Sequence, residues 1–176
     1  MKTPAGWTTR PTSDRVKESL FSVLNGMIDF SEVETVLDIF AGTGSLGLES
    51  VSRGAESAVF IDSSTTDLIG DNVRRAKFEN QCRVLRGDFV GLMKKISRQN
   101  LQFELIFSDP PYKKNLAQIS INLVAELDLL KINGLLVVEH GGDEIFDSLP
   151  ENLSPVRKLS YGNTTTIEIY SKNLSR

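Results

Sequence analysis

The sequence predicts a single α/β domain with a mostly parallel sheet, helices on both faces and an antiparallel hairpin at the C-terminus. Three observations support this fold class. Short apolar, β-branched runs alternate with segments of helical periodicity along most of the chain. A glycine-rich turn joins the first run to the helix that follows it. The last two runs flank Gly162-Asn163, a dipeptide typical of a hairpin turn.

The expected elements follow one another with short connections. A first helix begins near Pro11 and carries apolar residues at helical spacing as far as Ile28. The expected strands are 35–39, 57–61, 83–86, 105–107 and 135–138, with helices at 45–53, 65–79, 90–98 and 115–129 and hairpin strands at 156–161 and 165–170. Right-handed crossovers then place helices on both faces of the sheet.

The composition favours one soluble domain over residues 1–176, with an irregular segment at 1–11. Its apolar runs are far shorter than a membrane span, so no membrane partner is expected, and a cytoplasmic location is the default. Cys82 is the only cysteine and His140 the only histidine, so no metal site is expected.

The net charge of −3 does not by itself indicate a nucleic-acid-binding protein. Total charge is a poor guide where basic residues cluster. Three clusters occur, and each is interpreted as a solvated face unless a site lies beside it: Arg10, Arg15 and Lys17; Lys94, Lys95 and Arg98; Lys113 and Lys114.

A glycine loop follows the first expected strand. Gly42, Gly44 and Gly47 have the G-x-G-x-x-G spacing of a nucleotide-type cofactor site, where glycine lets the backbone approach a ligand. Asp38 precedes the loop, and its carboxylate would repel a pyrophosphate. It suits a cationic ligand, such as the sulfonium and ammonium groups of S-adenosylmethionine (SAM). The alternative is a purely structural role for Asp38.

Acidic residues end four of the expected strands: Asp38, Asp62, Asp88 and Asp109. Ligands of open α/β sheets bind outside the carboxyl ends of the strands. Asp62 suits a ribose, which both NAD and SAM contain. Asp88 suits an adenine amino group, with Phe89 against the ring. For Asp62 and Asp88 the alternative is capping of the next helix.

The segment Asp109-Pro110-Pro111-Tyr112 carries the reaction chemistry. Proline has no N–H, so carbonyls here are left to accept hydrogen bonds. Asp109 offers a second acceptor and Tyr112 a flat face, which together suit a planar group with an exocyclic amine. Such an amine attacks a methyl carbon when it is well positioned. The alternative is a turn that is merely fixed by proline.

These motifs resemble the class I SAM-dependent methyltransferases. Within that class the chain resembles the RsmD family, which methylates N2 of one guanine in bacterial 16S ribosomal RNA. The matching segments keep the family's order along nearly the whole chain: Arg10–Glu18, Leu37–Glu49, Asp109–Tyr112, Val138–His140 and Tyr161–Thr165.

The resemblance implies a Rossmann-like, seven-stranded sheet and SAM as cofactor. The implied cofactor-binding residues are Asp38, Phe40, Ala41, Gly42, Thr43, Gly44, Asp62, Asp88 and Phe89. Asp109, Pro110, Pro111 and Tyr112 would surround the target amine. Arg10, Thr12 and Arg15 would meet RNA phosphates at the mouth of the site. The implied partner is 16S rRNA. Independently of the resemblance, the net charge of −3 favours RNA within a small-subunit assembly, and a monomer is the favoured oligomeric state.

One feature departs from the family pattern. The family usually begins with a short basic β-hairpin, which residues 1–7 are too few to form. Either the chain is truncated or this member lacks the element.

Three other functions are considered. A DNA adenine or other amino methyltransferase shares the Asp109–Tyr112 chemistry but usually needs a target-recognition domain, for which the chain has no room. An NAD(P)-dependent oxidoreductase shares the glycine spacing but predicts a hydride-transfer residue set that is not evident. A non-catalytic RNA-binding protein would not need Asp109.

Overall fold

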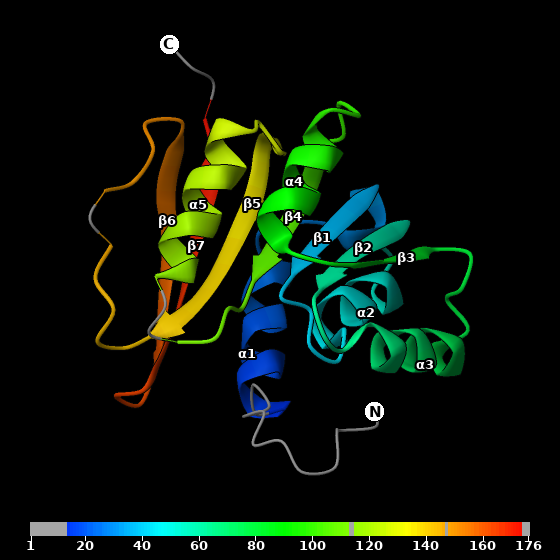
Figure 1. Ribbon diagram of the computed structural model, residues 1–176. Coiled ribbons are helices and arrows are strands. Elements are labelled where there is room, and N and C mark those ends of the chain that lie inside the picture. The colour runs from blue at the N-terminus through cyan, green and yellow to red at the C-terminus, as the bar shows by residue number, and fades with distance from the viewer. Residues whose placement is uncertain (1–13, 113–114, 147, 174–176) are drawn as a thin grey trace.

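Seven strands form one sheet in the computed structural model, which describes residues 14–112, 115–146 and 148–173 (Figure 1). The strands are β1 (Thr35–Ile39), β2 (Ser57–Asp62), β3 (Cys82–Arg86), β4 (Phe103–Ser108), β5 (Leu130–Gly141), β6 (Leu153–Tyr161) and β7 (Thr165–Lys172). The helices are α1 (Asp14–Asn25), α2 (Ser45–Ser52), α3 (Thr66–Ala76), α4 (Phe89–Ser97) and α5 (Leu116–Glu126), with a 3-10 turn η1 (Phe30–Glu32).

The strand order is β3-β2-β1-β4-β5-β7-β6. Strands β1 to β5 pair in parallel, and β7 runs antiparallel to both β5 and β6. The expected mostly parallel sheet with a C-terminal hairpin is therefore confirmed. The order differs from the dinucleotide-binding order 3-2-1-4-5-6, because β7 is inserted between β5 and β6.

Helices cover both faces of the sheet, as expected for βα units (Figure 1). Strand β1 shows the reason in its alternation: Val36 packs in a core with residues of α1, α2 and α3, whereas Leu37 and Ile39 pack with α4 and α5. Four of the five residues of β1 are buried, which is typical of a central parallel strand.

Several boundaries differ from the sequence expectation by three residues or more, and two of them have a clear local cause. Helix α1 ends at Asn25 rather than Ile28, because a turn at Gly26 leads into η1. Strand β5 begins at Leu130, five residues before the expected start. Gly134 was expected to end a segment, but it lies inside the strand beside a register irregularity, where a Cβ would come within 2.8 Å of a backbone oxygen.

Several expectations concern residues outside the described part of the chain. Arg10, Thr12 and the shortened hairpin lie within residues 1–13. Among the described residues, no helix is long and apolar enough to cross a membrane. The same part of the chain has no group of three or more potential metal ligands.

Candidate active site

The glycine loop leaves β1 with three glycines in different roles. Gly42 and Gly44 have φ angles of 58° and 75°, a backbone region that favours glycine. Gly47 lies in the first turn of α2, where a Cβ would come within 2.4 Å of the Phe60 ring. Two glycines therefore shape the turn, and the third lets α2 pack closely against β2.

Asp38 lies near the end of β1, just before the glycine loop. Its side chain is 1% exposed, and Oδ2 accepts a hydrogen bond of 3.0 Å from the N–H of Gly47. Burial raises the pKa of Asp38 to about 7. The carboxyl group thus joins the end of β1 to the first turn of α2 across the glycine loop, and its contact with a cationic ligand stays a prediction.

Asp62 joins the glycine loop to the start of α3. Its carboxylate accepts from the N–H groups of Gly42 at 3.0 Å, Ser64 at 2.8 Å and Thr65 at 2.9 Å. Burial opposes ionisation, but these donors outweigh it and hold the pKa of Asp62 below its usual value. Asp62 is half-buried, so an ionised acceptor lies beside the loop.

Two aromatic rings lie at the same edge. Phe40 and Phe89 have ring centroids 4.6 Å apart, and Phe40 adopts a φ of 60°. A left-handed aromatic residue is a strained feature of the kind that clusters at functional sites. Asp88 caps α4 by accepting from Gly91 N–H at 2.9 Å, so its alternative capping role is observed. Its contact with adenine stays a prediction.

Asn72 was not identified from the sequence. It is 3% exposed on α3, and its side-chain amide donates to the carbonyl of Thr43 at 2.9 Å. Ala41 is fixed as well, since its N–H donates to the carbonyl of Ile61 at 3.0 Å. The only sequence signal for Asn72 was a polar residue among the apolar residues Ile69 and Val73 of α3.

The Asp109–Tyr112 segment begins where β4 ends, next to β1. The N–H of Asp109 lies 3.5 Å from the carbonyl of Ile39, the last residue before the glycine loop. Asp109 is half-buried and Pro110 is buried, whereas Pro111 is exposed. The sheet therefore brings together the two motifs that the sequence separates by about sixty residues.

Tyr112 is held by two further strands. Its hydroxyl donates to Glu139 Oε1 of β5 at 2.9 Å and lies 3.2 Å from Thr165 Oγ1 of β7. Burial and the carboxylates of Glu139 and Asp109 raise the pKa of Tyr112 to about 12, so the phenol is neutral near pH 7. Glu139 and Thr165 were not predicted as site residues.

Arg15 is the one predicted RNA-contacting residue that lies in the described chain. It is exposed in the first turn of α1. One turn further, Ser19 Oγ accepts a hydrogen bond of 2.9 Å from the hydroxyl of Tyr161, at the tip of the β6–β7 hairpin. The beginning of α1 and the hairpin tip are therefore in contact.

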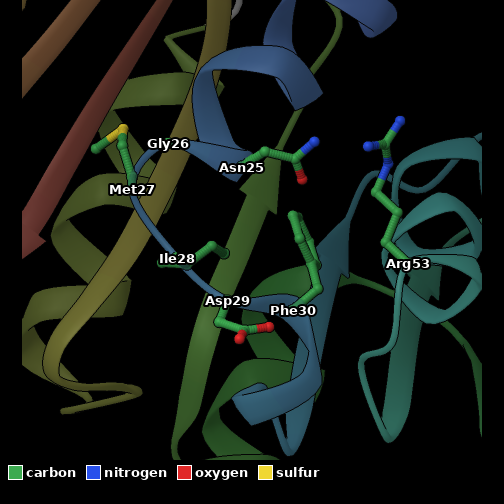
Figure 2. Close-up of a pocket in the computed structure, with 7 residues that line it drawn as sticks. All are labelled: Asn25, Gly26, Met27, Ile28, Asp29, Phe30 and Arg53. Carbon is green, nitrogen blue, oxygen red and sulfur yellow. The ribbon is translucent and has the colours of Figure 1, made fainter.

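A surface hollow of about 490 Å³ lies at the other end of α1 (Figure 2). Asn25, Phe30 and Arg53 are among its lining residues. Arg53 pairs with Glu49 at 2.8 Å, and its guanidinium lies 4.8 Å from the centre of the Phe21 ring. Arg53 follows the C-terminal end of α2, away from the glycine loop that begins this helix, so the hollow does not belong to the site.

Comparison with known proteins identifies the family. A family model described as "Conserved hypothetical protein 95" matches residues 1–171. The chain belongs to this family. It is 33% identical to the Putative rRNA methyltransferase YlbH of Bacillus subtilis (strain 168), covering 98% of this chain and 92% of the relative. It is 36% identical to the Ribosomal RNA small subunit methyltransferase D of Haemophilus influenzae, covering 87% and 78% of the two chains.

Solved structures agree with the family assignment. The putative methyltransferase yhhF from Escherichia coli superposes with a TM-score of 0.83 at 28% identity, covering 98% of this chain and 91% of that one. More distant structures with the same fold include methyltransferases with S-adenosylhomocysteine bound. The predicted resemblance to the RsmD family is confirmed, and the chain is a methyltransferase by family and fold. The oxidoreductase alternative is not supported.

Proposed function

We propose that this methyltransferase transfers the methyl group of SAM to the exocyclic N2 amine of a guanine in 16S rRNA. The observation that carries the proposal is the position of Asp109–Tyr112 at the end of β4, next to the glycine loop after β1. One motif suits an amine and the other a cationic cofactor, and the sheet makes them neighbours. The relatives' names supply the class of RNA.

The chain's residues fit SAM in charge and shape. Asp62 ends β2 and Asp88 follows the neighbouring strand β3, and this pair of carboxylates favours a cation over a pyrophosphate. Space for a ligand is available beside Gly42, since a Cβ built there would have one neighbour within 4 Å, the Phe40 carbonyl oxygen at 3.9 Å. Asp62 would hold the ribose hydroxyls, and Asp88 with Phe89 the adenine. When bound, SAM would supply an electrophilic methyl group to the amine nitrogen, with the neutral thioether of S-adenosylhomocysteine as the leaving group.

The residues of the chain act mainly by positioning. Asp109 and the Pro110 carbonyl would accept hydrogen bonds from the two amine hydrogens, which turns the nitrogen lone pair away from conjugation with the base. Tyr112 would lie against the base, with its neutral hydroxyl bound to Glu139. Asp109 would also stabilise the positive charge that develops on nitrogen and accept the proton that the product amine releases.

Arg10, Thr12 and Arg15 would contact RNA phosphates at the mouth of the active site. The enzyme would be a single-domain monomer that acts in the cytoplasm on a small-subunit assembly. A net charge of −3 supports the view that ribosomal proteins complete the recognition of the RNA.

The test uses SAM with a labelled methyl group and small subunits from cells that lack this methylation, followed by nucleoside analysis. We expect N2-methylguanosine as the labelled product. Asp109→Ala should abolish transfer while calorimetry shows SAM binding largely unchanged. Label in another nucleoside would refute the assigned substrate, and full activity of Asp109→Ala would refute the mechanism.

A further inference from the structure

Basic residues are concentrated in one part of the chain. Residues 74–98 contain eight Lys and Arg but only two Asp and Glu. The whole chain has 20 basic and 23 acidic residues, so the other 151 residues carry 12 basic against 21 acidic. The small net charge therefore conceals a strongly basic segment in an otherwise acidic protein.

This segment builds one side of the molecule. It comprises the end of α3, the edge strand β3 and helix α4. Strand β3 lies between the two helices, because Val84 packs in the core with α3 and Leu85 in the core with α4 (Figure 1). We call its eight exposed basic residues the basic edge: Arg74, Arg75, Lys77, Arg83, Arg86, Lys94, Lys95 and Arg98.

Most of these charges have no acidic partner within the described part of the chain. Arg74 pairs with Asp71 at 2.5 Å, and Arg86 lies 3.9 Å from Asp67. Among the ion pairs of the described residues, none involves the other six. The charges of the basic edge are therefore directed mainly to solvent.

Fold stability explains only part of this pattern. Arginines on β3 discourage pairing with another strand, and lysines in the last turn of α4 suit the helix dipole. The opposite edge strand β6 has comparable protection from Pro155, Arg157 and Lys158. However, the nearby helix α5 contains no basic residue, whereas α4 contains two and Arg98 follows it. Edge protection thus does not require a basic helix.

The electrostatics of the active site supply the second argument. Asp62, Asp88, Asp109 and Glu139 place carboxylates around the proposed amine and cofactor positions. These carboxylates admit a base but repel phosphate groups, so the phosphates that Arg10, Thr12 and Arg15 are proposed to meet lie only at the rim of the site. Phosphate contacts provide much of the affinity in nucleic-acid complexes, so further phosphate contacts are expected elsewhere on the protein.

Resting on the proposed function, we infer that the basic edge binds phosphate groups of the substrate RNA at a distance from the methylated guanine. Strand β3 is three positions from β4 in the sheet, or about 14 Å at the usual strand spacing. An RNA helix or strand that presents its guanine at Asp109 is long enough to cross this distance. The basic edge then supplies affinity, and Asp109–Tyr112 selects the amine.

The test compares two double variants with the same change in net charge. Lys94→Gln/Lys95→Gln alters the basic edge, and Arg157→Gln/Lys158→Gln alters the opposite edge. KM is measured on undermethylated small subunits, and Kd on protein-free 16S rRNA, at several salt concentrations. Calorimetry with SAM and thermal unfolding check the cofactor site and the fold.

We expect the basic-edge variant to raise KM and the RNA Kd about 10-fold at low salt, with kcat and SAM affinity unchanged. Each lost phosphate contact should also lower the slope of log Kd against log salt by about 0.7–0.9. The control variant should match the wild type in both measurements.

Equal KM, Kd and salt slopes for the two variants, with an active wild type, would overturn the inference. An effect on subunits but none on protein-free RNA would overturn it as well, because the occupant would then be an acidic protein surface. A wild-type enzyme that methylates no guanine contradicts the proposed function itself. RNA binding by the variants then separately decides whether the basic edge contacts phosphates.

Discussion

The hydroxyl of Tyr112 donates a hydrogen bond to Glu139 Oε1 at 2.9 Å. The phenol has one proton, so its oxygen remains to accept from Thr165, 3.2 Å away. The last residue of the Asp109–Tyr112 segment is therefore tied to β5 and β7. This arrangement fixes the direction of the ring that the proposed mechanism places against the base.

Glu139→Ala should consequently lower kcat about 10-fold with SAM affinity unchanged, because a hydrogen bond to a charged acceptor contributes about 1.5–3 kcal/mol. Glu139→Gln keeps an acceptor oxygen and should retain most of the activity. If Glu139 acts through the Tyr112 hydroxyl, Glu139→Ala should cost nothing further in the Tyr112→Phe background. Steady-state kinetics of the four proteins in this cycle measure the coupling. Additive losses would show that Glu139 acts by another route.

The sequence predicts features that depend on neighbouring residues, but not contacts between residues far apart along the chain. The strand, glycine loop and helix over residues 35–52 were predicted within one residue, because their turn chemistry and periodicity are local. The contacts of Tyr112 join residues 27 and 53 positions apart, and that of Asn72 joins residues 29 apart. Such contacts depend on strand order and register, which a single sequence does not specify.

The longer β5 illustrates the same limit. Gly134 has the local signature of a break. Within β5 the same glycine is instead required by packing, because a Cβ would come within 2.8 Å of the Lys131 carbonyl oxygen and 3.0 Å of the Glu104 carbonyl oxygen on β4. Packing with a neighbouring strand therefore decides the outcome.

Gly47→Ala should destabilise the protein, because its new Cβ would lie 2.4 Å from the fully buried ring of Phe60. Overpacking of this kind costs about 1–3 kcal/mol. Gly70→Ala is the matched control: Gly70 lies inside α3, and its Cβ would meet nothing closer than Arg74 Nη1 at 3.6 Å. That variant should be neutral or more stable by up to about 1 kcal/mol.

Urea unfolding measures both glycine variants. Phe60→Leu should recover part of the loss when combined with Gly47→Ala, since it removes the ring that the Cβ meets. Equal stabilities of Gly47→Ala and Gly70→Ala would show that the close approach of α2 and β2 is not required.

Asp38 predicts a pH dependence of stability. Its folded pKa of about 7 lies above the usual value near 3.9, so between these values the folded state holds a proton that the unfolded state has released. This contribution is complete below about pH 4 and is lost as the pH rises through 7. Asp38→Asn does not titrate and still offers an oxygen to Gly47 N–H.

The free energy of unfolding of the wild type should therefore fall relative to that of Asp38→Asn between pH 4 and 7. The slope is at most about 1.4 kcal/mol per pH unit. Urea titrations of both proteins at half-unit intervals measure the difference, in which the other titrating groups cancel. Parallel curves would mean that the Asp38 carboxyl group ionises normally in the fold.

Asp62 has two roles that one experiment can separate. It holds the glycine loop through Gly42, Ser64 and Thr65, and it is proposed to accept hydrogen bonds from the ribose hydroxyls. Asp62→Ala should weaken binding of S-adenosylhomocysteine about 10-fold or more by calorimetry. That loss alone does not distinguish a distorted loop from a lost ribose contact.

The 2′,3′-dideoxy analogue of S-adenosylhomocysteine makes the distinction, because it lacks the hydroxyls that Asp62 would bind. The wild type cannot make the ribose contact with this analogue. Asp62→Ala should therefore weaken binding of the analogue much less than it weakens binding of S-adenosylhomocysteine. Asn72→Ala serves as the control, because it removes the hydrogen bond to Thr43 in the same loop. This variant should lower the affinity for both ligands by the same factor. If Asp62→Ala also lowers the affinity for both ligands by the same factor, the carboxylate of Asp62 supports the loop and does not contact the ribose.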